Sequence, residues 1–312
     1  MKKIISIFLI AIVSGAIVGF GINDWQKTTF AYKQSFTANI EQAASQADSL
    51  TAPGQEPKIA AASALLAEIT ENGEPKIIFA KNQEQKNPIA SLTKIMTAVI
   101  ASEFYEKNQT IIINKQAIEQ FDASGNLKAG EQFNLNNLLR VMLIESSNDA
   151  AFALTEPMAG PAGFVALMNL KAKDLGLENT AFFSPSGLDP EDAGLPAEQI
   201  NQSTVIDLAK LAQFVVYHHP EITKILSEKE TAVYSQGNEF YHSLVNTNEL
   251  LGKFSSIIGG KTGTTERAGG CLLLILQGKN PPSRFVAVVL NSPDKFKDME
   301  NIITAYGFWT HY

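Results

Sequence analysis

The sequence predicts one α/β domain, residues 57–312, in which a mostly antiparallel sheet built from both chain ends packs against a helical subdomain. Three observations lead to this fold class. Segments with strand character lie near both ends of this region, and a block of segments with helical periodicity lies between them. Hydrophobic residues make up 45% of the 312 residues, which is enough for a sizeable core.

The first two expected strands form a hairpin. Apolar residues dominate Ser63 to Thr70 and Lys76 to Ala80, and the five residues between these runs include Asn72-Gly73. Asn-Gly between two apolar runs is a strong hairpin signal, because both residues tolerate positive φ.

The middle of the chain has the periodicity of helices. Apolar residues at helical spacing predict a helix from Ser91 to Tyr105. The same pattern predicts further helices at Leu135 to Leu143, Ala150 to Met158, Phe164 to Leu175 and Thr204 to Tyr217. Residues 176–202 contain three prolines and are expected to be irregular.

Strand character returns near the end of the chain. Ser255 to Thr265, Cys271 to Gln277 and Phe285 to Leu290 are rich in strand-forming residues. A final helix is expected from Glu300 to Trp309.

An uncharged segment follows Lys2 and Lys3. Ile4 to Ile22 is 19 residues long, which gives a helix of ~28 Å, close to the ~30 Å hydrocarbon core of a bilayer. Lysines tend to stay in the cytoplasm, so residues 1–22 are expected to anchor an extracytoplasmic protein to the cell membrane. A cleaved signal and a secreted protein are the alternative, because Ser14-Gly15-Ala16 is a candidate cleavage site. The polar residues 23–56 are expected to form a stalk.

Composition excludes several classes of function. The formal charge of −7 argues against nucleic acid as a partner. Cys271 is the only cysteine, which rules out an internal disulfide and a cysteine-based zinc site, and no histidine lies in a metal-binding pattern. No metal or other cofactor is therefore expected.

Three short motifs carry the expected chemistry. They are Ser91-Leu92-Thr93-Lys94 (S-x-x-K) at a helix start, Ser146-Ser147-Asn148 (S-x-N) between two helices and Lys261-Thr262-Gly263 (K-T-G) on a strand. Each motif alone is weak, because S-x-x-K recurs at residues 292–295 and S-x-N at residues 124–126. Context separates the copies, since Pro293 interrupts one and the other lies in a polar loop.

The first two motifs suit nucleophilic catalysis. Residues i and i+3 share one helix face, so Lys94 can reach the hydroxyl of Ser91. A lysine acts as a base only when neutral, and burial together with a second cation, Lys261, lowers its pKa. Asn148 can hold the Lys94 amine and a substrate amide, and Ser146 can relay a proton towards a leaving amine.

The third motif suits substrate binding. A backbone N–H at Thr264 is expected to complete an oxyanion hole with the N–H of Ser91. Lys261, Thr262, Gly263 and Thr264 are the expected substrate-binding residues, and their side chains suit a terminal carboxylate.

These motifs and their surroundings resemble the D-alanyl-D-alanine carboxypeptidase family of low-molecular-mass penicillin-binding proteins. The likeness runs over roughly residues 59–309 and includes residues 128–131, 143–151, 183–189, 246–251 and 259–269. It implies the fold shared with β-lactamases and acyl-serine chemistry on peptidoglycan stem peptides that end in D-Ala-D-Ala. It also implies β-lactam antibiotics as covalent inhibitors, with Ser91 as nucleophile and Lys94 as base. Ser146, Asn148 and Lys261 are then their active-site partners.

Two features depart from the family. Many relatives carry a further β-rich domain and a C-terminal membrane helix, and here the N-terminal segment is expected to serve as the anchor instead. Relatives also tend to have an arginine before the last helix, where this chain has residues 292–297, Ser-Pro-Asp-Lys-Phe-Lys. The resemblance leaves open which residue, if any, replaces that arginine.

A serine D,D-peptidase that trims the terminal D-alanine is the expected function. A β-lactamase on the same fold is one alternative, but no glutamate between Asp149 and Gly260 has the Glu-x-x-Leu-Asn spacing of class A β-lactamases. A catalytically silent wall-binding protein is another, although a pure binder need not keep both Lys94 and Lys261. The choice between carboxypeptidase and endopeptidase action, the third residue of the stem peptide and the oligomeric state stay open.

Overall fold

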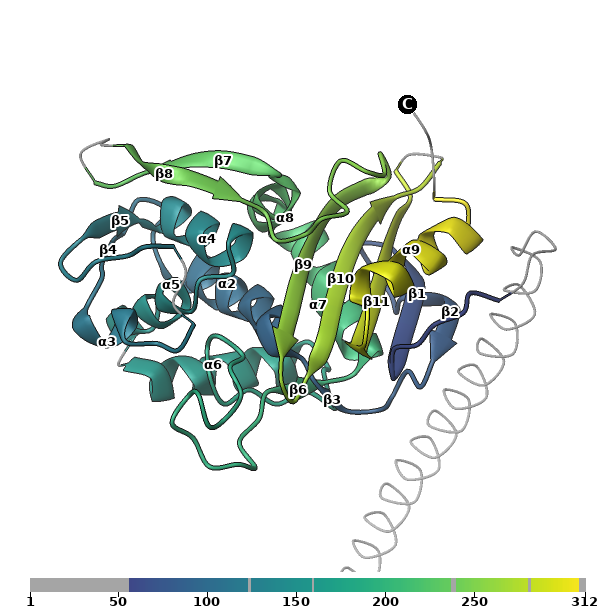
Figure 1. Ribbon diagram of the computed structural model, residues 1–312, viewed down its shortest axis with the longest axis horizontal. Coiled ribbons are helices and arrows are strands. Elements are labelled where there is room, and N and C mark those ends of the chain that lie inside the picture. The colour runs from purple at the N-terminus through teal and green to yellow at the C-terminus, as the bar shows by residue number, and fades with distance from the viewer. Residues whose placement is uncertain (1–55, 123–124, 159, 237–239, 280–281, 309–312) are drawn as a thin grey trace, which may run out of the picture. The chain divides into compact units, whose positions relative to one another are not determined.

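The computed structural model describes residues 56–308 apart from residues 123–124, 159, 237–239 and 280–281 (Figure 1). These residues belong to one compact unit, Ala52–Tyr312. The expected anchor and the stalk up to residue 55 lie outside the described residues. Within the described ranges, no single helix has the length and apolar composition to cross a membrane, and one pair bent by 92°, Asn148–Met158 with Gly160–Asp174, meets both criteria only when taken together.

A five-stranded antiparallel sheet lies at the centre of the fold, in the order β2-β1-β11-β10-β9. The strands are β1 (Ser63–Ile69), β2 (Lys76–Lys81), β9 (Ile257–Thr265), β10 (Gly269–Gln277) and β11 (Arg284–Ser292). Ser63 of β1 lies opposite Leu290 of β11, so the two ends of the domain meet in one sheet. The predicted sheet from both chain ends is therefore confirmed.

Helices cover both faces of this sheet, as Figure 1 shows with α9 (Lys295–Ala305) in front and α7 (Val205–His218) behind. Neighbouring strand residues point to opposite faces. Leu65 therefore joins the core cluster that contains α7, whereas Leu66 joins the cluster that contains α9. Because both faces are buried, β10 has a continuous apolar run rather than an alternating one.

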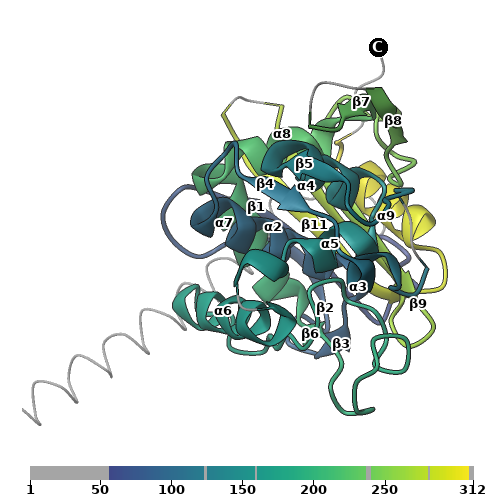
Figure 2. The same cartoon turned by 90° about the vertical axis from the view of Figure 1, so that its left-hand side faces the viewer.

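A helical region lies beside β9 (Figures 1 and 2). It consists of the 3₁₀ turn Ala90–Leu92, α2 (Thr93–Phe104), α3 (Lys115–Ile118), α4 (Leu135–Ile144), α5 (Asn148–Ala153), the 3₁₀ turn Glu156–Met158 and α6 (Gly160–Asp174). Residues 93–101 of α2 are all buried, so this helix is the core of the region. Its burial places the first motif inside the molecule, against the sheet.

Smaller elements complete the fold. They are the strand pairs β3 (Asn87–Pro88) with β6 (Gln202–Ser203), β4 (Thr110–Ile112) with β5 (Gln132–Asn134) and β7 (Glu230–Tyr234) with β8 (Phe240–Val245), and the helix α8 (Pro220–Ser227). The β7–β8 hairpin and α8 were not predicted. Residues 176–202 are irregular up to β6, as predicted.

Three predicted helices have wrong boundaries. The helix predicted from Phe164 begins at Gly160. The last helix begins at Lys295 rather than Glu300, because the Asp294 side chain caps it by accepting a hydrogen bond from the backbone N–H of Lys297 at 3.0 Å. The helix expected from Ala150 to Met158 is broken: α5 ends at Ala153, and a 3₁₀ turn follows.

Candidate active site

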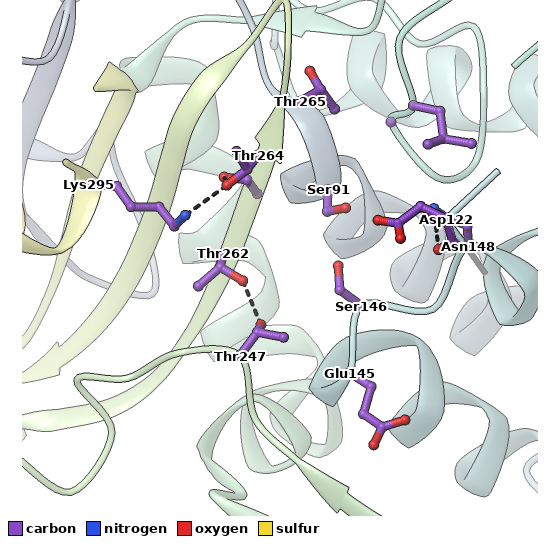
Figure 3. A pocket seen from close by; sticks show the side chains of 13 residues that line it. Ser91, Asp122, Glu145, Ser146, Asn148, Thr247, Thr262, Thr264, Thr265 and Lys295 are labelled. Atoms are coloured by element: carbon purple, nitrogen blue, oxygen red, sulfur yellow. Dashed lines mark hydrogen bonds between the residues drawn. The ribbon is translucent and has the colours of Figure 1, made fainter. Parts of the chain in front are cut away.

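A cavity of about 290 Å³ separates β9 from the helical region. Its lining comes from all three motifs and from the loop before β6. The lining residues are Ser91, Asp122, Glu145, Ser146, Asn148, Gly187, Leu188, Thr247, Thr262, Gly263, Thr264, Thr265 and Lys295. Figure 3 shows Ser91 and Ser146 in the middle of this cavity, with Thr262 and Thr264 on the β9 side.

The first two motifs meet at the Lys94 amine. Ser91 lies in the 3₁₀ turn that leads into α2, and Lys94 lies in the first turn of that helix. The Nζ of Lys94 donates to Ser91 Oγ at 2.8 Å, to Asn148 Oδ1 at 2.8 Å and to the Ser186 carbonyl at 2.9 Å. Three elements thus fix this amine beside one hydroxyl.

Burial favours the neutral form of the Lys94 amine, which can act as a base. The side chain is fully buried. Loss of hydration lowers the pKa of Lys94 well below its usual value, the charge of Lys261 lowers it further, and the carboxylate of Asp122 opposes the shift. A neutral amine at this place can accept the proton of Ser91.

The second and third motifs meet at the Lys261 amine. Lys261 Nζ donates to Ser146 Oγ at 2.9 Å and to the Thr262 carbonyl at 2.9 Å. Burial, and then the charge of Lys295, lower the pKa of Lys261 to about 7. An amine that titrates near neutral pH can both take up and release a proton through Ser146.

The β9 strand approaches the nucleophile closely because of a glycine. A Cβ atom on Gly263 would lie 3.0 Å from the backbone nitrogen of Ser91 and 3.0 Å from the Ala90 Cβ. Thr262 Oγ1 and Thr247 Oγ1 are 2.5 Å apart on the same wall. This wall therefore presents hydroxyl groups to the cavity that Ser91 also lines.

The irregular segment before β6 closes the cavity from a third side. Asp189 accepts hydrogen bonds from Thr265 Oγ1 at 2.7 Å and from the Arg267 backbone at 3.0 Å, which ties this loop to the end of β9. Gly187 has a φ of +83°, and a Cβ there would lie 2.0 Å from the Ala90 carbonyl oxygen. The loop can therefore deliver the Ser186 carbonyl to Lys94 only with glycine at this position.

All eight residues predicted for the site come together around this cavity. Sequence reasoning missed the Ser186 carbonyl, since a backbone acceptor has no signature in the side-chain pattern. It also left open the role of Lys295, whose Nζ donates to Thr264 Oγ1 at 2.7 Å. A signal was present, because Lys295 is a cation in the stretch where the resemblance led us to expect an arginine.

A solved structure shares this fold. Penicillin-binding protein D2 from Listeria monocytogenes, solved in an ampicillin-bound form, is 28% identical with a TM-score of 0.68, over 81% of this chain and 100% of that one. The chain thus has the DD-peptidase and β-lactamase fold, which confirms the predicted fold class.

Sequence comparison defines the family. The model of the peptidase S11 family, D-alanyl-D-alanine carboxypeptidase, matches residues 50–294. D-alanyl-D-alanine carboxypeptidase DacF of Bacillus subtilis is 32% identical over 232 residues, which are 72% of this chain and 57% of that protein. The D-alanyl-D-alanine endopeptidase of Escherichia coli is 28% identical over 263 residues, 82% of this chain and 75% of that protein.

This chain belongs to the D-alanyl-D-alanine carboxypeptidase family, as the resemblance implied. It spans a little more than half the length of DacF.

Proposed function

We propose that this protein is a serine D-Ala-D-Ala carboxypeptidase that releases terminal D-alanine from peptidoglycan stem peptides. The observation that carries the proposal is the Lys94 amine, which is buried and lies 2.8 Å from both Ser91 Oγ and Asn148 Oδ1. The relatives include a carboxypeptidase and an endopeptidase, and the first of these is the activity we assign.

The acylation step follows from these contacts. Neutral Lys94 takes the proton of Ser91, and the Ser91 oxygen attacks the carbonyl carbon of the penultimate D-alanine. The backbone N–H groups of Ser91 and Thr264 stabilise the oxyanion that forms. As the C–N bond breaks, the leaving amine takes a proton from Ser146, which Lys261 replaces.

The substrate lies along β9 in this proposal. Thr262, Gly263 and Thr264 line that side, and Lys261 precedes them on β9. Asn148 holds the amide of the acyl donor from the other side. After the free D-alanine has left the cavity, Lys94 gives the Ser91 proton to solvent and Lys261 takes up one proton from solvent. Water then hydrolyses the acyl-serine with neutral Lys94 as base. No cofactor enters any of these steps.

Labelling of the nucleophile tests the assignment. A fluorescent penicillin should attach covalently to Ser91, and Ser91→Ala should abolish labelling while the melting temperature stays close to that of the wild type. Ser292→Ala is the matched control, because Ser292 begins the second S-x-x-K motif but donates to Asp298 at 2.6 Å, away from the cavity lining. Labelling that persists in Ser91→Ala would contradict the proposal.

The lifetime of the label separates this function from a β-lactamase. Among the described residues that line the cavity, the one glutamate is Glu145, which lies 3.0 Å from His242 Nε2. Without a glutamate placed to activate water, hydrolysis of the bulky penicilloyl ester should be about 10²–10⁴-fold slower than in a β-lactamase that has one. We expect long-lived penicillin labelling together with D-alanine release from a D-Ala-D-Ala peptide. Rapid penicillin turnover without D-alanine release would favour the β-lactamase.

The N-terminal segment is proposed to hold this enzyme at the outer face of the cell membrane. The uncharged run Ile4–Ile22 after two lysines supports this location. Membrane fractions should contain the full-length chain, with residues 4–22 found by mass spectrometry. A mature protein that begins near Ile17 would show a cleaved signal instead.

A further inference from the structure

The two carboxylates on the helical side of the cavity, Asp122 and Glu145, differ in their partners. Glu145 lies 3.0 Å from Nε2 of His242, which belongs to β8. Within the described part of the chain, no hydrogen bond and no ion pair reaches the Asp122 carboxylate. Figure 3 shows this carboxylate turned into the cavity, towards Ser91. Asp122 is therefore the cavity carboxylate with which a ligand can pair.

The backbone holds Asp122 in this place. Asp122 has a φ of +50°, in the left-handed region that aspartate and asparagine tolerate better than most other residues. Asn148 Nδ2 donates to the Phe121 carbonyl at 2.9 Å and to the Asp122 carbonyl at 3.4 Å. A Cβ on Gly125 would lie 2.6 Å from Val141 Cγ1, so the same segment packs closely against α4. The carboxylate is thus a placed group, and because the residue is exposed a ligand can reach it.

The surrounding charges favour a cationic ligand. The charge of Asp122 acts on the Lys94 amine, where it opposes the lowering of the Lys94 pKa. Burial and the charge of Lys261 outweigh this effect, so Lys94 stays neutral and does not compensate Asp122. Figure 3 shows Lys295 on the other side of Ser91. A cation that enters the cavity beside Asp122 would therefore meet an anion that neither Lys94 nor Lys295 neutralises.

Asp122 lies at the acyl-donor end of the cavity. In the proposed function, Asn148 holds the amide that precedes the penultimate D-alanine, and Asn148 also contacts the backbone of Asp122. That contact is the longer of the two made by Asn148 Nδ2, so one N–H of this side chain can turn to the substrate. The residue joined to the substrate amide is the third residue of the stem peptide. Its side chain, rather than the methyl group of either D-alanine, can carry a charge to Asp122.

We propose that Asp122 binds a side-chain amine on the third residue of the stem peptide, so that the enzyme prefers substrates in which this residue is a diamino acid. The inference rests on the proposed D-Ala-D-Ala peptidase function and adds a specificity-determining residue to it. An ammonium group on a flexible stem donates hydrogen bonds that a carboxylate accepts. Acylation of the amine removes its charge. A stem peptide whose third side chain already carries an amide therefore loses this contact.

Paired substrates test the proposal. Nα-acetyl-L-Lys-D-Ala-D-Ala and its Nε-acetylated form differ only at the side-chain amine. The wild type should cleave the peptide with the free amine with a kcat/KM about fivefold higher, mainly through a lower KM. This preference should weaken as the ionic strength rises from about 0.05 to about 0.5 M, a measurement that needs no variant.

Asp122→Asn should reduce the preference for the free amine to less than about twofold, by raising KM for that peptide alone. Asparagine also tolerates a positive φ, so the backbone should be kept. Glu119→Gln is the matched control, because Glu119 is an exposed carboxylate earlier in the same segment and lies outside the cavity lining. It should keep the preference of the wild type, which separates a contact in the cavity from the general charge of this surface.

Acylation by benzylpenicillin checks the rest of the cavity, because this β-lactam has no side-chain amine. Its rate should be the same in Asp122→Asn as in the wild type. The inference would be overturned by a wild type without preference, by an unchanged preference in Asp122→Asn, or by an equal loss of kcat/KM on both peptides. The last result would mean that Asp122 serves the reaction itself. D-alanine release and Ser91 labelling by the wild type would stand in each case, so the proposed function fails only on its own test.

Discussion

The two walls of the cavity hold their chemistry in different ways. On the sheet side, Lys261 to Thr264 lie in a part of β9 that pairs with β10 in one unbroken register. On the helical side, three non-glycine residues in or next to the cavity wall have positive φ: Ala90 at 46°, next to Ser91, Asp122 at 50° and Ser146 at 65°. Such conformations cost about 1–3 kcal/mol each and persist only where the surroundings enforce them.

This difference shows which wall of the cavity needs a strained backbone. The sheet wall presents a row of hydroxyl groups and an amine, which a regular strand supplies without strain. The helical wall has to bring Ser91, Lys94, Ser146 and Asn148 together from separate segments. The strained backbone therefore lies on the wall that carries the nucleophile and the base, and each wall can be tested by substitution.

The largest expected effect concerns the base on the helical wall. Lys94→Met removes the amine but keeps much of the buried volume, so labelling of Ser91 by penicillin should slow by about 10²–10⁴-fold. Lys261→Met on the sheet wall should slow labelling by about 10-fold, because Lys261 donates to Ser146, whereas Lys94 donates to Ser91 itself. Stopped-flow labelling measures both rates. Equal losses of labelling rate in the two variants would show that Lys94 and Lys261 contribute equally to acylation. That result would contradict the separate roles assigned to the two walls.

The second prediction concerns the strained packing of the helical wall. A Cβ at Gly187 would lie 2.0 Å from the Ala90 carbonyl oxygen and 2.7 Å from Thr93 Oγ1, at a φ of +83°. Gly187→Ala should lower the free energy of unfolding by about 4 kcal/mol and the melting temperature by about 8–16 °C.

Gly194→Ala is its control in the same irregular segment. Gly194 has a φ of +67°, and a Cβ added there would meet no other atom within 4 Å, so this substitution carries only the backbone penalty. Its expected cost is about 1 kcal/mol. Similar melting temperatures for the two variants would contradict the close contact between the loop and Ala90.

The third prediction concerns Asp149, which follows Asn148 on the helical wall. The side chain is 2% exposed, its Oδ1 has no hydrogen-bond partner among the described residues, and burial raises its pKa to about 6. Since the unfolded carboxyl titrates near pH 4, the folded state binds the extra proton between about pH 4 and 6. The contribution of Asp149 to stability is therefore complete below about pH 4 and is lost as the pH rises through about 6.

Asp149→Asn should remove the loss of stability that the wild type shows as the pH rises through about 6. At pH 7 the variant should be more stable than the wild type by at most about 3 kcal/mol, and at pH 4 the two should be alike. Urea unfolding at both pH values measures the difference. Asp192→Asn, at an exposed position, is the control and should show no such pH-dependent gain. A gain that is the same at pH 4 and pH 7 would rule out titration of Asp149 as its cause.

The sheet was the most predictable part of the fold. Its strands have local signals, such as the Asn72-Gly73 turn and the apolar run of β10, and they needed no long-range information. The last helix was misplaced because its start depends on distant contacts as well as on the local Asp294 cap. Asp298 has the character of a surface residue, but it is buried and accepts hydrogen bonds from the backbone of Ala60 and Ala61.

The site residues that belong to the three motifs were predictable from the sequence. S-x-x-K, S-x-N and K-T-G name the side chains, and helix periodicity alone puts Lys94 within reach of Ser91. The Ser186 carbonyl and the positive φ of Ser146 are properties of the backbone, which no side-chain pattern encodes. Lys295 reaches the cavity only because α9 begins five residues earlier than expected, so the error in the fold concealed a residue of the site.

The smallest expected effect tests the distance between the two walls. A Cβ on Gly263 would lie 3.0 Å from the Ser91 backbone nitrogen, so Gly263→Ala should push β9 and the nucleophile apart by a few tenths of an ångström. The expected cost in stability is about 1 kcal/mol, and labelling of Ser91 by penicillin should slow by about 10-fold, because acylation depends on the placement of both walls. Gly259→Ala, on the same strand, meets Leu226 Cβ at an ordinary 3.4 Å and should leave labelling unchanged. If Gly263→Ala loses stability but keeps the labelling rate, the strained helical wall positions the nucleophile without help from the sheet.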